Sequence, residues 1–172
     1  NGNAYLKNIQ WGRKVLLQNP EIITLSQAEK KVNFDGPLVS SIVPFYNRKD
    51  MLRLTIKSLI KQNYLNHQII FVDDGSTQEL EPFIKDKLKF FKGDWKIIRI
   101  NYNSGPGIAR KVGMENCNGK YIQFIDSDDE PLPDKISAQV NILEKNKKLL
   151  MTYGTTIILS LIHISEPTRQ LC

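Results

Sequence analysis

Short apolar runs alternate with amphipathic segments along the chain from residue 38 onward. The apolar runs are rich in β-branched and aromatic residues and predict buried strands over residues 38–44, 67–72, 95–100, 121–125 and 149–153. Apolar residues spaced three and four apart predict helices over residues 49–62, 106–117 and 133–146. This alternation predicts an α/β fold with a mostly parallel sheet and helices on both faces.

A further helix is expected between the second and third strands, through the region 85–91. Ser76 and Glu79 have the spacing of a capping box. We therefore expect this helix to begin near Ser76, with Pro82 in its first turns.

The N-terminal segment has a different pattern. Residues 4–18 mix apolar and basic side chains and predict an amphipathic helix, and linkers are expected near Pro20 and Gly36. Residues 1–37 are thus expected to form a helical extension and linker. A basic amphipathic helix can pack against the domain or lie on a membrane, so peripheral contact with the inner face of a membrane stays an open interpretation.

The C-terminal residues are expected to be non-native. Residues 159–169 match, at every position, the in-frame translation of a common transposase-type sequencing adapter. We treat residues 159–172 as an adapter-derived tail and expect the natural protein to be interrupted near Ile158. The expected domain is then the segment 38–158, incomplete at its C-terminal end.

Composition restricts the functional class only slightly. The chain has 172 residues, 41% of them hydrophobic, which fits one globular domain. Its 24 Lys and Arg residues against 18 Asp and Glu residues favour an acidic partner, such as a phosphate-bearing ligand or an anionic surface. Two cysteines are too few for a disulfide framework and no apolar run could span a bilayer, so we expect a cytoplasmic protein.

Carboxylates gather where the predicted strands end. Asp126, Asp128 and Asp129 follow the fourth strand, and Asp73 and Asp74 follow the second. Ligands of open parallel sheets bind outside these strand ends. Two carboxylates ~4 Å apart repel by roughly 4 kcal/mol at an effective dielectric constant of ~20. We therefore expect a hard divalent cation, Mg²⁺ or Mn²⁺, at this edge of the sheet.

Four motifs, taken in order and spacing, resemble the nucleotide-sugar-binding half of a family-2 glycosyltransferase, which has the GT-A fold. They occupy residues 37–48, 70–77, 103–110 and 126–129. The resemblance covers about residues 38–153. It implies metal-dependent transfer of a sugar from a nucleotide-diphosphate donor, typically UDP-linked, to a saccharide or lipid-linked acceptor. It also implies an inverting reaction whose carboxylate base lies beyond Ile158, so no catalytic residue is expected within the chain.

The resemblance also implies roles for individual residues. Pro44 and Tyr46 would border the nucleotide base, and Asp74 would accept a hydrogen bond from it. Arg110 would approach the diphosphate.

The segment Asp126, Ser127 and Asp128 matches the family's Asp-X-Asp motif. Asp128 is the expected principal metal ligand, and Asp126 is the second ligand, nearer the ribose. All three residues are expected to contribute to nucleotide-sugar binding.

Other functional classes fit less well. A dinucleotide-binding oxidoreductase requires Gly-X-Gly-X-X-Gly directly after the first strand, where Asn47, Arg48 and Lys49 stand. A calcium loop beginning at Asp126 requires glycine at its sixth position, which is Pro131. No stripe of aromatic and basic residues and no zinc-ligand spacing supports nucleic acid as a partner. A non-catalytic nucleotide-sugar-binding fragment stays the alternative to an enzyme.

Overall fold

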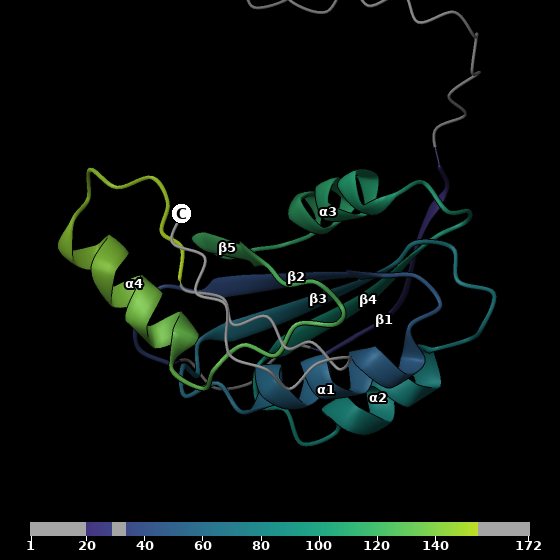
Figure 1. Ribbon diagram of the computed structural model, residues 1–172, viewed down its shortest axis with the longest axis horizontal. Helices are drawn as coiled ribbons and strands as arrows, with labels where there is room; N and C mark the ends of the chain where they lie inside the picture. The colour runs from purple at the N-terminus through teal and green to yellow at the C-terminus, as the bar shows by residue number, and fades with distance from the viewer. Residues whose placement is uncertain (1–19, 29–33, 155–172) are drawn as a thin grey trace, which may run out of the picture.

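One five-stranded sheet organises the protein, and its strand order is β1-β4-β3-β2-β5 (Figure 1). The structure is a computed structural model that describes residues 20–28 and 34–154. The strands are β1 (Ile22–Ala28), β2 (Val39–Phe45), β3 (His67–Asp73), β4 (Asp94–Ile100) and β5 (Tyr121–Phe124). The helices are α1 (Lys49–Ile60), α2 (Glu81–Leu88), α3 (Pro106–Glu115) and α4 (Lys135–Lys145).

The connections between the parallel strands reverse direction at β2. Strands β2, β3, β4 and β5 are parallel, and β1 pairs antiparallel with β4. The chain moves outward from β2 through α1 to β3 and through α2 to β4, and α3 then carries it back to β5 on the other side of β2. The carboxyl ends of β2 and β5 therefore flank a topological switch point, where open α/β sheets bind their ligands.

Each face of the sheet packs against its own set of helices. On one face, the buried side chains of β2, β3 and β4 pack with Leu52, Ile56 and Leu59 of α1 and with Ile84 of α2. On the other face, only α3 covers the strands among the described residues, as Figure 1 shows. Gly113 allows α3 to approach closely, because a Cβ there would lie 2.3 Å from Cγ2 of the buried Ile42.

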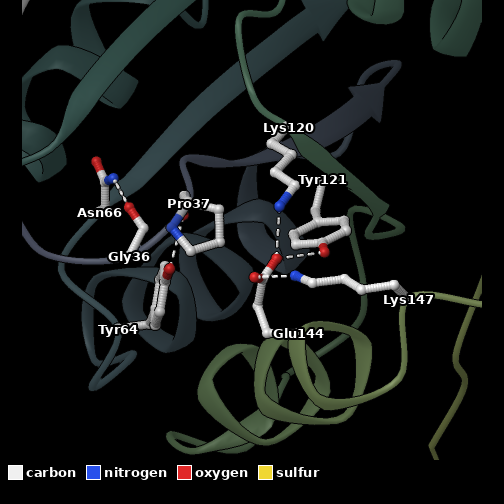
Figure 2. A network of polar contacts seen from close by, with 8 residues as sticks. All are labelled: Gly36, Pro37, Tyr64, Asn66, Lys120, Tyr121, Glu144 and Lys147. Atoms are coloured by element: carbon white, nitrogen blue, oxygen red, sulfur yellow. Dashed lines mark hydrogen bonds and ion pairs between the residues drawn. The ribbon is translucent and has the colours of Figure 1, made fainter.

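Helix α4 is joined to the start of β5 by the polar network drawn in Figure 2. One carboxylate oxygen of Glu144 accepts hydrogen bonds of 2.6 Å from Lys120 Nζ and from the Tyr121 hydroxyl, and Lys147 binds the other oxygen. These hydrogen bonds, that of Lys120 foremost, lower the pKa of Glu144 to about 2. The network lies at the amino end of the sheet, so it supports the fold at the end opposite the switch point.

Most of the predicted elements are confirmed. Four strands and three helices occur within two residues of their expected bounds, and the sheet is mostly parallel with helices on both faces. Within residues 20–28 and 34–154, no helix is long and apolar enough to span a membrane. The predicted N-terminal helix over residues 4–18 lies outside the described residues.

The predicted capping box at Ser76 is wrong. Helix α2 begins at Glu81, after Leu80, and Pro82 occupies its first turn. The backbone N–H of Ser76 instead donates to Asp73 Oδ1 at 2.8 Å. Ser76 is therefore held in the turn that ends β3, and helix α2 begins only five residues later, at Glu81.

Two further differences concern the edges of the sheet. Strand β1 was missed, because its exposed residues show no clear alternation of apolar and polar positions. The strand predicted over residues 149–153 is wrong, since no strand occurs there. Leu150 is 98% exposed and Tyr153 is 81% exposed. The described residues therefore offer this segment no neighbouring strand and no core to bury its apolar side chains.

Candidate functional site

The four motifs singled out in the sequence converge at the carboxyl edge of the sheet. Tyr46 follows β2, Asp74 follows β3, Ser104 lies in the loop after β4, and Asp126 follows β5. The loops after β2 and β5 flank the switch point directly, because these two strands are neighbours in the sheet. The candidate site is therefore built at the position that the topology favours for a ligand.

The turn after β5 is anchored to the rest of the domain. The N–H of Ile125 donates to the carbonyl of Ile42 at 3.0 Å, which extends the pairing of β5 with β2. The hydroxyl of Thr55, fully buried in α1, donates to the carbonyl of Ser127 at 2.9 Å. Ser127 is itself buried, whereas the side chains of Asp126 and Asp128 are 56% and 46% exposed. The two carboxylates are thus held on a fixed turn and face solvent.

Each of these two carboxylates has its own arginine. Arg48 Nη1 donates to Asp128 Oδ2 at 3.0 Å, and Arg110 Nη2 donates to Asp126 Oδ1 at 2.6 Å. Arg48 comes from the loop that leads into α1, and Arg110 comes from the first half of α3. The loop before α1 and helix α3 therefore bring positive charge to the acidic turn (residues 126–129), which offsets the repulsion between its carboxylates.

The loop that carries Arg48 is fixed by its neighbour Asn47. Asn47 has a positive φ of 52°. Its side-chain oxygen accepts hydrogen bonds from the N–H and the hydroxyl of Thr77 at 2.9 and 3.0 Å. Its N–H donates to Ser76 Oγ at 2.9 Å. These contacts join the loop after β2 to the loop after β3 and set the direction in which the chain enters α1.

Asp73 stabilises the loop after β3 from inside the fold. It is 2% exposed, accepts the N–H of Ser76 and lies 3.6 Å from Arg99 Nη1. Arg99 also donates to the Ser76 carbonyl at 2.6 Å. Asp73 is therefore a structural residue of the site.

Asp74 joins this loop to the one before α3. It is 4% exposed, and its two carboxylate oxygens accept the N–H groups of Ser104 and Gly105, each at 2.8 Å. Gly75 allows the approach, because its φ is +75° and a Cβ there would lie 2.5 Å from the backbone of Tyr102. Beyond this contact, a Cβ at Gly105 would meet nothing within 4 Å, so the start of α3 borders open space.

The structure brings four of the predicted binding residues into one cluster: Arg110, Asp126, Ser127 and Asp128. Tyr46 is 40% exposed and lies two residues before Arg48. Pro44 is buried within β2. Asp74 is linked to the site through its loop contacts. The roles of these residues toward a nucleotide sugar stay predictions.

Sequence reasoning missed Arg48 and Thr55. Arg48 stands inside the first motif, but only the adjacency of β2 and β5 reveals that it meets Asp128. Thr55 left a weaker signal, a polar residue on the apolar face of α1 between Leu52 and Leu59.

Asp126 and Asp128 offer a partial metal site. Among the described residues, no three His, Cys, Asp or Glu side chains are placed to hold a metal ion together. Magnesium is commonly bound by one or two carboxylates and completed by substrate phosphates and water. The donor chemistry of Asp126 and Asp128 therefore fits a divalent ion whose remaining ligands come from a diphosphate.

Comparisons with known proteins find similar proteins over much of the chain. The family model described as Glycosyl transferase family 2 matches residues 40–159. The chain is 39% identical over 118 residues, 69% of its length, to an "Uncharacterized glycosyltransferase" of Haemophilus influenzae. It is 40% identical over 123 residues, 70% of its length, to the "UDP-Glc:alpha-D-GlcNAc-diphosphoundecaprenol beta-1,3-glucosyltransferase WfaP" of Escherichia coli.

A solved structure is similar over a comparable share of the chain. The crystal structure of S. aureus TarS 1-349 in complex with UDP matches 63% of this chain with a TM-score of 0.59 and 27% identity. The chain spans 46% of the Haemophilus protein, 47% of the Escherichia protein and 32% of the TarS structure. It thus corresponds to less than half the length of each of these proteins.

Proposed function

This chain belongs to glycosyl transferase family 2, and from this premise we propose that its parent protein transfers a sugar from a UDP-linked donor to a saccharide or lipid-linked acceptor. The observation that carries the proposal is the position of Asp126 and Asp128 at the switch point, facing Arg110 and Arg48. The UDP complex of TarS and the name of the Escherichia relative support the donor. That relative's diphosphoundecaprenol substrate supports a lipid-linked acceptor, which would place the parent protein at the cytoplasmic face of a membrane.

The proposed chemistry follows from the charge that develops on the leaving group. Cleavage of the bond between sugar and phosphate releases a nucleoside diphosphate, whose growing negative charge must be stabilised. A bound Mg²⁺ or Mn²⁺ supplies a Lewis acid for these phosphate oxygens. Asp126 and Asp128 would hold this ion, and Arg110 would add a fixed positive charge beside the diphosphate. Tyr46 would stack on the base, which Pro44 would border from within β2.

The acceptor side of the reaction requires a further residue. An inverting transfer needs a carboxylate base that removes the proton of the acceptor hydroxyl. We propose that this base lies outside the described residues, as membership of the family implies. The described residues would then bind and orient the donor.

The proposal can be tested by binding, without turnover. UDP is titrated by calorimetry into the 172-residue chain with Mn²⁺ and then with EDTA. We expect Mn²⁺ to strengthen UDP binding in the wild type. We expect Asp128→Asn to weaken that metal-dependent binding by about tenfold or more, because loss even of a residue that only orients a metal ligand commonly costs about 10- to 100-fold in metal affinity.

Asp86→Asn is the matched control, because it removes an exposed carboxylate on α2, away from the site. It is expected to bind UDP like the wild type. Equal UDP affinity with and without Mn²⁺, or full metal dependence in Asp128→Asn, would contradict the proposed donor site.

A further inference from the structure

Two carboxylates of the acidic turn are each engaged by an arginine. Two carboxylates, Asp126 and Asp128, pair with two guanidinium groups, Arg110 and Arg48. A divalent cation that enters this group alone must compete with a guanidinium for carboxylate oxygens. A nucleoside diphosphate brings phosphate oxygens that the displaced guanidinium can bind in place of the carboxylate. The arrangement therefore disfavours metal without donor.

The two arginines differ in how firmly they are held. Arg110 lies 2.6 Å from Asp126, and its side chain is 34% exposed. Arg48 lies 3.0 Å from Asp128, and its side chain is 53% exposed. Exposed ion pairs contribute little net stability. Arg48 is thus the arginine that a metal ion would displace more easily.

The loop that carries Arg48 is held by side-chain hydrogen bonds, whereas the Arg48 side chain is half-exposed. The preceding residue, Asn47, is hydrogen-bonded to Ser76 and Thr77. These bonds hold the backbone of Arg48 beside the switch point. Arginine is suited to this task, because its planar guanidinium binds either a carboxylate or a phosphate through two parallel N–H groups.

We propose that Arg48 couples metal binding to donor binding. In the metal-free site Arg48 occupies Asp128; when metal and nucleotide diphosphate bind together, Arg48 leaves Asp128 and donates to the diphosphate. This inference rests on the proposed donor site and deepens it, since it assigns a second guanidinium to the diphosphate beside that of Arg110. It also explains why a basic residue stands in the loop after β2, opposite the acidic turn.

The test measures Mn²⁺ affinity with and without UDP. Free Mn²⁺ is followed by its electron paramagnetic resonance signal during titration of the 172-residue chain. We expect Arg48→Ala to bind Mn²⁺ alone roughly two- to fivefold more tightly than the wild type, because the competing cation is gone. We expect the same variant to gain less Mn²⁺ affinity from UDP than the wild type gains.

Two further variants serve as controls. Arg48→Lys keeps the charge but loses the bidentate geometry, so its coupling should lie between those of the wild type and Arg48→Ala. Arg53→Ala removes an exposed basic residue outside the site, on the helix that follows Arg48, and should behave like the wild type. Circular dichroism verifies that each variant is folded.

The outcomes separate this inference from the proposed function. Mn²⁺-dependent UDP binding that is as strongly coupled in Arg48→Ala as in the wild type would overturn the role of Arg48 and leave the donor site intact. Unchanged or weaker affinity of Arg48→Ala for Mn²⁺ alone would also overturn it. Absence of Mn²⁺-dependent UDP binding in the wild type would overturn the donor site and the coupling together.

Discussion

The hydroxyl of Thr55 donates a 2.9 Å hydrogen bond to the carbonyl of Ser127, a residue 72 positions further along the chain. Thr55 is fully buried in α1, and Ser127 lies between the two carboxylates of the acidic turn. This bond ties the turn to the helix whose first residues follow Arg48. The geometry of Asp128 and its arginine thus depends on a hydroxyl that is fully buried beneath the turn.

Removal of that hydroxyl should loosen the turn. In Thr55→Val the side chain keeps its shape, but the Ser127 carbonyl loses its donor, so we expect the free energy of unfolding to fall by about 1–3 kcal/mol. UDP binding in the presence of Mn²⁺ should weaken as well. Thr55→Ser retains the hydroxyl and is the control. Urea unfolding and calorimetry measure the two effects, and a valine variant that matches the wild type in both would contradict the anchoring role.

Asp74→Asn should affect stability and binding together. The asparagine amide offers one acceptor oxygen in place of two, so one of the N–H groups of Ser104 and Gly105 is left without its partner. We expect a loss of about 1–3 kcal/mol in the free energy of unfolding and weaker binding of UDP. Asp128→Asn provides the contrast. Because Asp128 is half-exposed, its replacement should weaken UDP binding with little change in the free energy of unfolding. Unfolding curves of Asp74→Asn that coincide with those of the wild type would contradict the structural part of this prediction.

Asn47 can be tested with a pair of variants. Asn47→Ala and Asn47→Gly both lose the hydrogen bonds from Thr77. Only alanine is strained at the positive φ of 52°, so the alanine variant should be less stable than the glycine variant by about 1 kcal/mol. Urea unfolding of the two proteins measures the difference. Equal stability would indicate that the loop relaxes to another conformation once its side-chain contacts are removed.

The parts of the fold that could be predicted are those with a strong local pattern. Strands β2 and β3 are buried on both faces, and each contains a run of consecutive apolar residues, 42–45 and 69–72, that identifies it directly. Strand β1 is an edge strand with exposed apolar residues such as Ile23, and no local pattern distinguishes it from a linker. The segment 149–153 shows the reverse case. Its apolar run predicts a strand, but it pairs with no strand among the described residues.

The candidate site was predictable in its residue types but not in its contacts. Parallel strands place their carboxyl ends at one edge, which brings Asp74 and Asp126 to the same edge from sequence alone. The pairing of Arg48 with Asp128 requires knowledge that β5 lies beside β2, and strand order is not written in any local pattern. The role of Thr55 depends on packing between α1 and a distant turn, which sequence spacing cannot reveal.

A buried histidine should make the stability of the protein depend on pH. His67 is 1% exposed at the start of β3, its Nε2 lies 2.6 Å from the Ser41 hydroxyl, and its ring meets that of Phe91 edge to face. Burial lowers the pKa of His67 from its usual 6.5 to about 3. The folded protein therefore resists protonation at a pH where the unfolded chain accepts a proton readily.

The direction of the effect follows from proton linkage. Above pH 6.5 the imidazole is neutral in both states, and its contribution to stability is complete; below that pH the unfolded state gains a proton, and stability falls until the folded state also protonates near pH 3. At pH 5.0 the expected loss is about 2 kcal/mol relative to pH 7.5. Urea unfolding at these two pH values and constant ionic strength measures it. The lowered pKa of Glu144 acts on a different range, because its contribution is lost as the pH falls from about 4.5 toward 2.

His67→Gln is the variant that isolates this contribution. Glutamine can still hydrogen-bond to the Ser41 hydroxyl but does not titrate, so most of the stability difference between pH 7.5 and 5.0 should disappear, whatever the variant's stability at pH 7.5. The comparison within each protein removes the cost of the substitution itself. If His67→Gln lost as much stability as the wild type between the two pH values, the pH dependence would have to come from other groups, and the buried neutral state of His67 would be contradicted.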